Sequence, residues 1–455
     1  MRIVSIFDKR LLVVLVAASA ALVLILWALG MQTARVAPDT PSYFEAIAGD
    51  PRNVIRHPLY GLAAHWLGAG PDKPGVVAQV QVALLIVASF ALYAGARAGG
   101  IGGWGALFLA LSGLLSQSAI LQVGLLLPES PAIAMLMMAF AGTLAASRGR
   151  RTFWWLLLPI ALTTGIGYLL RPSLLPAIII VPLLWLLFAL RNRQPHTIAS
   201  TLIVFVAVAS PFLGQSAMRW RAVGDFNIVS FGGYQMSAMA GFMLTPDLVA
   251  RLPVAVQPTA QAILKAREAA EIVGTVARTP ENSTGIRSFN SAGIGYFDIY
   301  ARSYDPLLVE ILKLKQPTED WIAFDRRLRG FSVATIIAAP VQWVSWVAGA
   351  SSRLAGRVIV TNAPVLVALF VLALAGVVAT IRRGGLVDAD RDVAAVSAVA
   401  VAWLAATAPL IVLITFPATR YIETAGVLLA AIPFMLAAAL IEALRTPAAA
   451  PGNGF

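Results

Sequence analysis

Ten runs of mostly apolar residues constrain the fold of this chain more than any other feature. They occupy residues 11–30, 76–95, 103–123, 130–146, 153–170, 173–190, 198–214, 361–381, 393–414 and 422–443. A helix needs about 20 such residues to cross a bilayer, and only 12% of the 455 residues are charged. The sequence therefore predicts an all-α polytopic membrane protein with about ten transmembrane helices.

The basic residues predict how these helices are oriented. Cytoplasmic loops of membrane proteins are enriched in Lys and Arg. In this chain the basic loops and ends contain Arg2, Lys9, Arg10, Arg97, Arg148, Arg150, Arg151, Arg191, Arg193, Arg382, Arg383 and Arg445. We therefore expect a multi-pass membrane protein with both termini in the cytoplasm. The net charge of +12 follows from this bias, so we expect membrane lipids as partners and no nucleic acid.

One further apolar segment, 331–350, conflicts with this orientation if it crosses the membrane. A crossing there would move Arg382 and Arg383 to the outside, and Pro340 interrupts the run. We interpret 331–350 as an amphipathic helix along the outer membrane interface. An eleventh transmembrane helix is the alternative.

The orientation divides the chain into three parts. Residues 1–214 form an N-terminal transmembrane module with a first extracytoplasmic loop at 31–75. Residues 215–360 form a large extracytoplasmic loop region, in which 258–278 has the apolar spacing of a helix. Residues 361–455 form a C-terminal transmembrane module and a tail.

The residue types exclude several kinds of chemistry. The chain has no cysteine, which excludes disulfides, thiolate catalysis and cysteine-bound metal. Its three histidines are too few and too scattered for a zinc motif. Neither a Ser-His-Asp order nor a Walker-type loop can be assembled from the sequence.

Two carboxylates lie beside apolar runs on the side opposite the basic loops. Asp39, in ARVAPDTPSYFEAI, is a candidate to deprotonate an acceptor hydroxyl or to bind a divalent metal such as Mg or Mn. The alternative for Asp39 is the N-cap of a short juxtamembrane helix. Glu129 opens an apolar run, where a carboxylate needs a partner or contact with water, and it is the second candidate catalytic residue. Its alternative is stabilisation by the helix dipole alone.

Arginines on the same face are candidates to bind an anionic group. Arg171 and Arg420 are exceptions to the basic-loop bias, and a guanidinium offers a fixed fork for phosphate or carboxylate. Snorkelling to the lipid headgroups is the alternative. Tyr421 adjoins Arg420 and either orients the donor phosphate or packs at the membrane interface. Arg56 and His57 either bind an anionic headgroup or solvate a loop near lipid phosphates.

Four other residues on this face complete the set. Tyr43 and Tyr60 lie in the first outer loop, and we include them with His57 as candidate substrate-binding residues. Arg219 and Arg221 begin the large outer loop, and we interpret both as solvated.

The chain resembles the bacterial GT-C glycosyltransferases, which are polytopic enzymes that use polyprenyl-phosphate-linked sugars outside the cytoplasm. The resemblance covers the layout of most of the chain and a few short motifs. These motifs are Asp39-Thr40-Pro41-Ser42-Tyr43, RHPLYGL with Arg56, Pro58 and Tyr60, LPESPAIAML with Glu129, LLRPSLL with Arg171 and Pro172, FPATRYIETAGVLL with Arg420 and Tyr421, and the interfacial run IIAAPVQWV. The first loop of that family often has two adjacent acids, whereas this chain has Asp39 alone, which counts against a metal site.

The resemblance implies a GT-C-like fold in a bacterial inner (plasma) membrane and an inverting transfer of a sugar to an extracytoplasmic glycan, lipid or protein. Asp39 is then the expected general base, and Arg171, Arg420 and Arg56 are expected to hold the donor phosphate. One alternative is an O-antigen polymerase or ligase, although residues 215–330 contain no histidine of the kind those enzymes use. Another is a lipid or solute transporter, although the acids within the ten apolar runs are confined to Glu423 and Glu442 at the two ends of the last run, away from mid-membrane.

Overall fold

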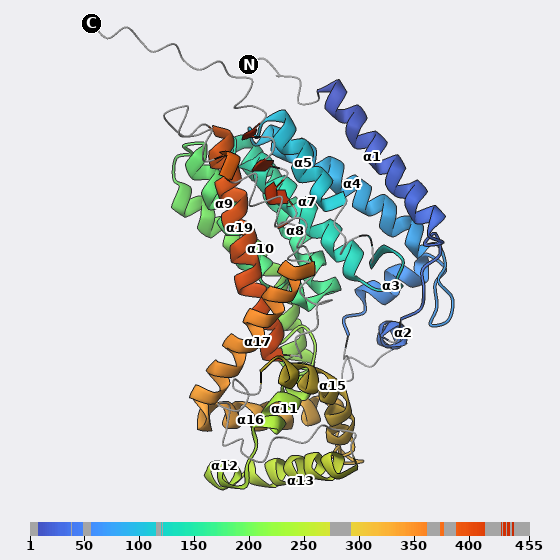
Figure 1. Cartoon of the computed structure of the whole chain (residues 1–455), viewed down its shortest axis with the longest axis vertical. Helices are drawn as coiled ribbons and strands as arrows, with labels where there is room; N and C mark the ends of the chain where they lie inside the picture. Colours follow the sequence, from blue (N-terminus) through green and yellow to red (C-terminus); the bar gives the residue numbers. More distant parts are fainter. Residues whose placement is uncertain are drawn as a thin grey trace, which may run out of the picture.

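The computed structural model describes residues 8–37, 39–48, 56–114, 120, 122–273, 293–361, 374–376 and 388–414, together with short pieces between 429 and 440. This described part of the chain is helical and has no β-strand. Figure 1 shows a long helical bundle with a second group of helices at one end.

Among the described residues, seven helices are long and apolar enough to cross a membrane, so the chain is a membrane-embedded, multi-pass, all-α protein. They are α1 (Lys9–Ala28), α4 (Val77–Ala98), α7 (Glu129–Ala146), α8 (Arg150–Leu170), the pair of η2 (Pro172–Leu174) and α9 (Ala177–Arg191), α10 (Thr197–Val223) and α19 (Asp388–Ile414). They correspond to seven of the ten predicted runs.

The other three predicted spans are not established. The run at 103–123 contains α5 (Gly103–Leu114), whose 12 residues are too few to cross alone. Residues 115–119 lie outside the described part of the chain, as do nearly all of 361–381 and most of 422–443.

Helix α7 forms the centre of the bundle and packs between α4 and α8. Most of its side chains are buried, whereas α1 and α10 leave large apolar side chains such as Trp27 and Val206 exposed, as expected for helices facing lipid. Small residues let α4 approach α7 closely: a Cβ on Gly95 would lie 2.2 Å from the carbonyl oxygen of Ala141. Such close backbone contact is typical of helix packing in membranes.

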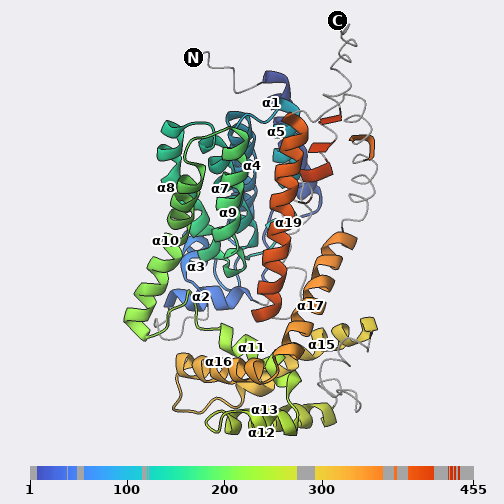
Figure 2. The same ribbon diagram turned by 90° about the vertical axis from the view of Figure 1, so that its left-hand side faces the viewer.

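The second group of helices forms a layer across one end of the bundle (Figures 1 and 2). It contains α2 (Thr40–Ala48), α3 (Leu59–Trp66), α11 (Gly232–Met243), α12 (Pro246–Arg251), α13 (Gln257–Val273), α15 (Gly293–Leu312) and α16 (Trp321–Ala338). We call it the helical layer. Helix α13 covers most of the predicted helix 258–278, and the rest of that segment lies outside the described residues.

The segment 331–350 is divided between two helices. Helix α16 ends at Ala338, α17 (Pro340–Thr361) begins at Pro340, and the two axes differ by 102°. The break follows from chemistry, because Pro340 has no N–H for a helical hydrogen bond and is suited to the first turn of a new helix. Helix α16 therefore lies within the helical layer, while α17 rises beside α19 (Figure 2).

The two ends of the bundle carry different residues. Arg191 forms an ion pair with Asp392 at the start of α19, and it also donates to Gly100 after α4. Glu129 at the start of α7 and Arg171 after α8 lie at the opposite end, where the helical layer covers the bundle. The alternation of helix direction thus separates the predicted basic end from the predicted site.

Candidate functional site

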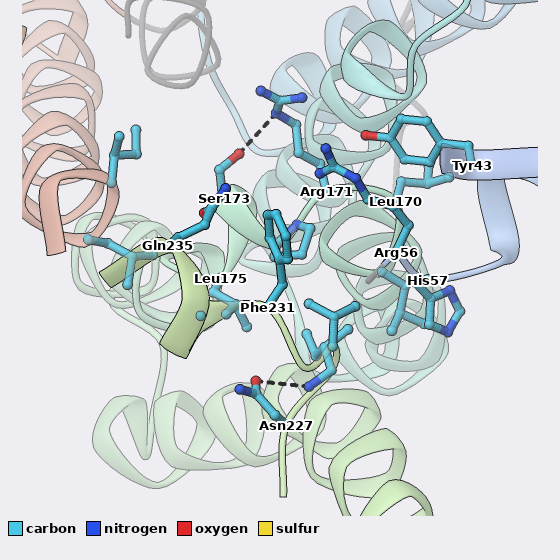
Figure 3. A pocket seen from close by; sticks show the side chains of 17 residues that line it. Tyr43, Arg56, His57, Leu170, Arg171, Ser173, Leu175, Asn227, Phe231 and Gln235 are labelled. Carbon is cyan, nitrogen blue, oxygen red and sulfur yellow. Dashed lines mark hydrogen bonds between the residues drawn. The ribbon is translucent and has the colours of Figure 1, made fainter. Parts of the chain in front are cut away.

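A cavity of about 170 Å³ lies between the bundle and the helical layer (Figure 3). Four segments that are distant in sequence line it, and they combine polar and cationic groups with aliphatic walls. The lining consists of Tyr43, Arg56 and His57 near α2 and α3, Leu169 to Ser173 and Leu175 around η2, Asn227 to Val229, Phe231, Gly232 and Gln235 near α11, and Leu410 and Ile411 of α19.

Arg171 reaches the cavity because α8 stops there. Its backbone is extended, with φ −145° and ψ 106°, as expected for a residue that precedes a proline. Its Nη1 forms an ion pair with Oε1 of Glu129, and its Nε donates to the Ser173 hydroxyl at 3.1 Å. The two charged side chains are only 7% and 5% exposed, so this is a buried pair.

Glu129 places its carboxylate behind Arg171, at the first residue of α7. The positive end of the helix dipole stabilises an anion in that position. Its Oε2 is buried and, within the described residues, has no hydrogen-bond partner. An unsatisfied carboxylate oxygen in such a site retains the capacity to accept a further hydrogen bond.

The Arg56 guanidinium packs against two aromatic rings that belong to different segments of the chain. Its guanidinium carbon is 5.1 Å from the ring centroid of Tyr43 and 5.8 Å from that of Phe231. Its Nη2 is 3.8 Å from Oδ2 of Asp39, and the two side chains are 26% and 32% exposed. This pair is therefore looser and more solvated than the pair of Arg171 and Glu129. Asp39 lies at the edge of the site and is not part of the cavity lining.

Tyr43 lies among the charges of the site. Burial raises its pKa to about 12, with Glu129 and Asp39 acting in the same direction and Arg56 and Arg171 in the opposite one. The phenol is therefore neutral at pH 7 and remains a hydrogen-bond donor. The Tyr60 ring packs edge-to-face against the Tyr43 ring, with centroids 5.3 Å apart. The Tyr60 hydroxyl accepts a hydrogen bond from Gln81.

His57 is a neutral member of the lining. Burial and, to a smaller extent, the positive charge of Arg219 lower its pKa to about 4. Its Nδ1 accepts the N–H of Leu59 at 3.3 Å, so the proton of the neutral ring is on Nε2. His57 thus supports the first turn of α3 and contributes no positive charge to the cavity at pH 7.

A buried ionic network fixes the loop that closes the cavity. Asp225 accepts from the Ser230 hydroxyl at 2.5 Å and from Arg329 at 3.0 Å, and Arg219 donates to Ser230. Burial alone would raise the pKa of Asp225, but the hydrogen bonds from Ser230 and Arg329 outweigh it and hold the pKa below its usual value. The prediction that Arg219 is solvated was wrong: it is 7% exposed, because the loop folds back and supplies Asp225.

The structure brings most of the predicted site residues together. Tyr43, Arg56, His57 and Arg171 line the cavity, and Glu129, Asp39 and Tyr60 contact members of that set. Arg420 and Tyr421 lie outside the described residues. Within the described part of the chain, no group of three or more His, Asp or Glu side chains is arranged to hold a metal.

Sequence reasoning missed the lining residues that α11 and its preceding loop supply. Asn227, Phe231 and Gln235 line the cavity but belong to a loop region without a distinctive motif. Ser173 was also missed, although its position two residues after Arg171 was a signal for a local hydrogen bond.

Comparison of this chain with protein-family models, with curated proteins and with solved structures finds no match.

Proposed function

We propose that this protein is a membrane glycosyltransferase that takes a sugar from a polyprenyl-phosphate donor and passes it to an acceptor outside the cytoplasm. The observation that carries the proposal is the cavity itself. It combines two guanidinium groups, Arg56 and Arg171, with hydroxyl and amide side chains and aliphatic walls. A phosphate joined to an apolar chain requires this combination.

The position of the cavity supports a lipid-borne substrate. Its lining includes the last residues of α8 and residues near the end of α19, so it lies where the membrane-spanning bundle meets the helical layer. A prenyl chain in the bilayer can deliver its phosphate to this level without leaving the lipid. The basic residues at the other end of the bundle favour a cytoplasmic location for that end, and therefore an extracytoplasmic cavity in a bacterial inner membrane.

In the proposed reaction, the acceptor hydroxyl attacks the anomeric carbon of the sugar. The bond between that carbon and the phosphate oxygen breaks, and polyprenyl phosphate leaves with the electron pair. Arg56 and Arg171 stabilise the charge that develops on the leaving phosphate. Asp39 receives the proton of the acceptor hydroxyl. Because the acceptor displaces the phosphate in a single step, the reaction inverts the anomeric configuration.

Each remaining residue has a defined task. A guanidinium has five N–H donors, so Arg171 is suited to hold Glu129 on one edge and phosphate on another. Glu129 thereby positions Arg171, and its second carboxylate oxygen is suited to accept from a sugar hydroxyl. Tyr43 supplies a neutral phenol, and His57 an N–H on Nε2. No step is assigned to a metal.

The test is transfer by the full-length protein in proteoliposomes, with a panel of radiolabelled polyprenyl-phosphate hexoses and pentoses and with envelope glycan acceptors. We expect Asp39→Asn to abolish transfer and Arg56→Gln to weaken donor binding. Asp247→Asn and Arg221→Gln are the matched controls, because both side chains are exposed and neither lines the cavity. Full transfer by Asp39→Asn would remove the assignment of the base, and donor movement across the bilayer without transfer would favour a transporter.

A further inference from the structure

A second hollow, on the helical layer, has the chemistry of a lipid headgroup site. It is an open groove of about 630 Å³ between the end of α12 and one face of α16. We call it the α12–α16 groove. It shares no lining residue with the cavity of Figure 3.

One end of the α12–α16 groove is strongly basic. Arg251, Arg326 and Arg329 all line it. Arg329 is largely neutralised, because its Nη2 lies 3.0 Å from Asp225 and 3.2 Å from Asp325. Arg326 donates to the carbonyl of Gly224 at 3.1 Å, and within the described residues neither it nor Arg251 forms an ion pair with a carboxylate. The groove therefore retains about two positive charges at neutral pH.

The other end of the groove is apolar and exposed. Val333 and Ile337 follow the arginines at helical spacing on the same face of α16, and they are 43% and 72% exposed. The exposed apolar side chains continue past the bend to Val341 and Val344 of α17, which are 78% and 58% exposed. Figure 2 shows that α17 rises beside α19. The apolar strip that these four side chains form therefore follows α16 and α17 from the groove toward the membrane-spanning bundle.

The floor of the groove is open between the two ends. Gly330 lies between the arginines and Val333, and a Cβ added to it would have no atom within 4 Å. A glycine in the middle of a helix costs about 1 kcal/mol relative to alanine. Without a side chain at Gly330, the groove is open between its basic end and its apolar end, so one bound molecule could extend from one end to the other.

We propose that the α12–α16 groove binds an anionic phospholipid of the surrounding bilayer. The phosphate contacts Arg251 and Arg326, and an acyl chain lies along Val333 and Ile337 toward α17. A bilayer lipid fits better than a peptide, because the charge is confined to one end and the apolar strip points to the membrane. Arginine near an anionic membrane surface contributes about 1 kcal/mol.

The experiment measures how much phosphatidylglycerol copurifies with the full-length protein after exchange into detergent with equal amounts of phosphatidylglycerol and phosphatidylcholine. Native mass spectrometry and phosphate analysis give the bound lipid. We expect Arg251→Gln with Arg326→Gln to lower the affinity for phosphatidylglycerol roughly thirtyfold, since about 1 kcal/mol for each arginine is about fivefold. The matched control is Arg221→Gln with Lys265→Gln, which removes the same charge from exposed positions outside the groove.

A second variant separates binding from folding. Gly330→Leu fills the groove without a clash at its Cβ, so we expect normal folding and loss of the copurified phosphatidylglycerol. Gly356→Leu is its control, because that glycine also faces open space but lies on α17, outside the groove. Phosphatidylglycerol binding that survives in both groove variants, or that falls equally in the controls, would overturn the proposal. Competition by millimolar inorganic phosphate would show that the groove binds free phosphate instead of a lipid.

Discussion

The buried ion pair of Glu129 and Arg171 provides a sharp test of the site. Removing one partner leaves the other charge uncompensated where water has little access. For a buried pair such a loss costs about 3–5 kcal/mol of unfolding free energy. The exposures of 7% and 5% place this pair in that range, well above the figure of at most about 1 kcal/mol for exposed pairs.

We expect a much smaller loss of unfolding free energy when both partners are replaced. Glu129→Leu with Arg171→Met removes both charges and keeps side chains of similar length, and replacing a buried pair in this way is often neutral. We therefore expect each single variant to lose about 3–5 kcal/mol and the double variant to lose about 1 kcal/mol or less. The two single losses add up to about 6–10 kcal/mol, so a double loss of about 1 kcal/mol or less leaves a coupling energy of at least about 5 kcal/mol in favour of the pair.

The assay is reversible unfolding in mixed micelles at increasing sodium dodecyl sulfate, followed by the fluorescence of the 11 tryptophans. The pair of Arg191 and Asp392 at the other end of the bundle is the control, because it is also largely buried. Both double variants should stay folded, but only the one lacking Arg171 should lose donor binding. Additive effects of the single variants would refute the inference that the two charges compensate each other.

Two other predictions concern stability. Because folding lowers the pKa of His57 from 6.5 to about 4, its contribution is complete above pH 6.5 and is lost as the pH falls toward 4. The unfolding free energy falls by at most about 3 kcal/mol between pH 6.5 and pH 4. Unfolding of the parent and of His57→Gln, compared across these pH values, measures this loss. Gly95→Val should lower the unfolding free energy by at least about 1–3 kcal/mol, because its Cβ would overlap the backbone of Ala141. A variant as stable as the parent would show that α4 and α7 can separate at little cost.

The membrane character of the chain was predictable because it depends on local composition. Each of the seven membrane helices corresponds to an apolar run that is recognisable without its neighbours. The division of 331–350 was partly predictable, since Pro340 marks the break, but the angle of 102° is set by packing beyond that residue.

The site was predictable as a set of residue types and not as a set of contacts. Glu129 and Arg171 lie beside apolar runs, where each charge needs a partner, yet nothing in the local sequence indicates that each is the partner of the other. The contact of Arg56 with Phe231 joins the first loop to the large loop, and only the folded chain brings them together. Arg219 was misjudged for the same reason, because its partner Asp225 depends on how the following loop turns.

In the proposed transfer, the charges of the site determine when the leaving phosphate is stabilised relative to the proton transfer to Asp39. Arg56 and Arg171 each have a carboxylate partner, so the resting cavity has little net charge. When Asp39 takes the acceptor proton it becomes neutral, and the full charge of Arg56 becomes available as the phosphate departs. The arrangement therefore couples deprotonation of the acceptor to stabilisation of the leaving group.

This coupling predicts that the variant that loses sugar transfer gains affinity for the leaving group. Asp39→Asn imitates the neutral state of Asp39, so it should bind polyprenyl phosphate more tightly than the parent even though it transfers no sugar. The gain should reach at most about fivefold, because a pair with side chains 26% and 32% exposed contributes at most about 1 kcal/mol. Binding of fluorescent polyprenyl phosphate to the protein in nanodiscs measures it. Weaker or unchanged binding in Asp39→Asn would show that Asp39 does not restrain Arg56 and that the two roles are separate.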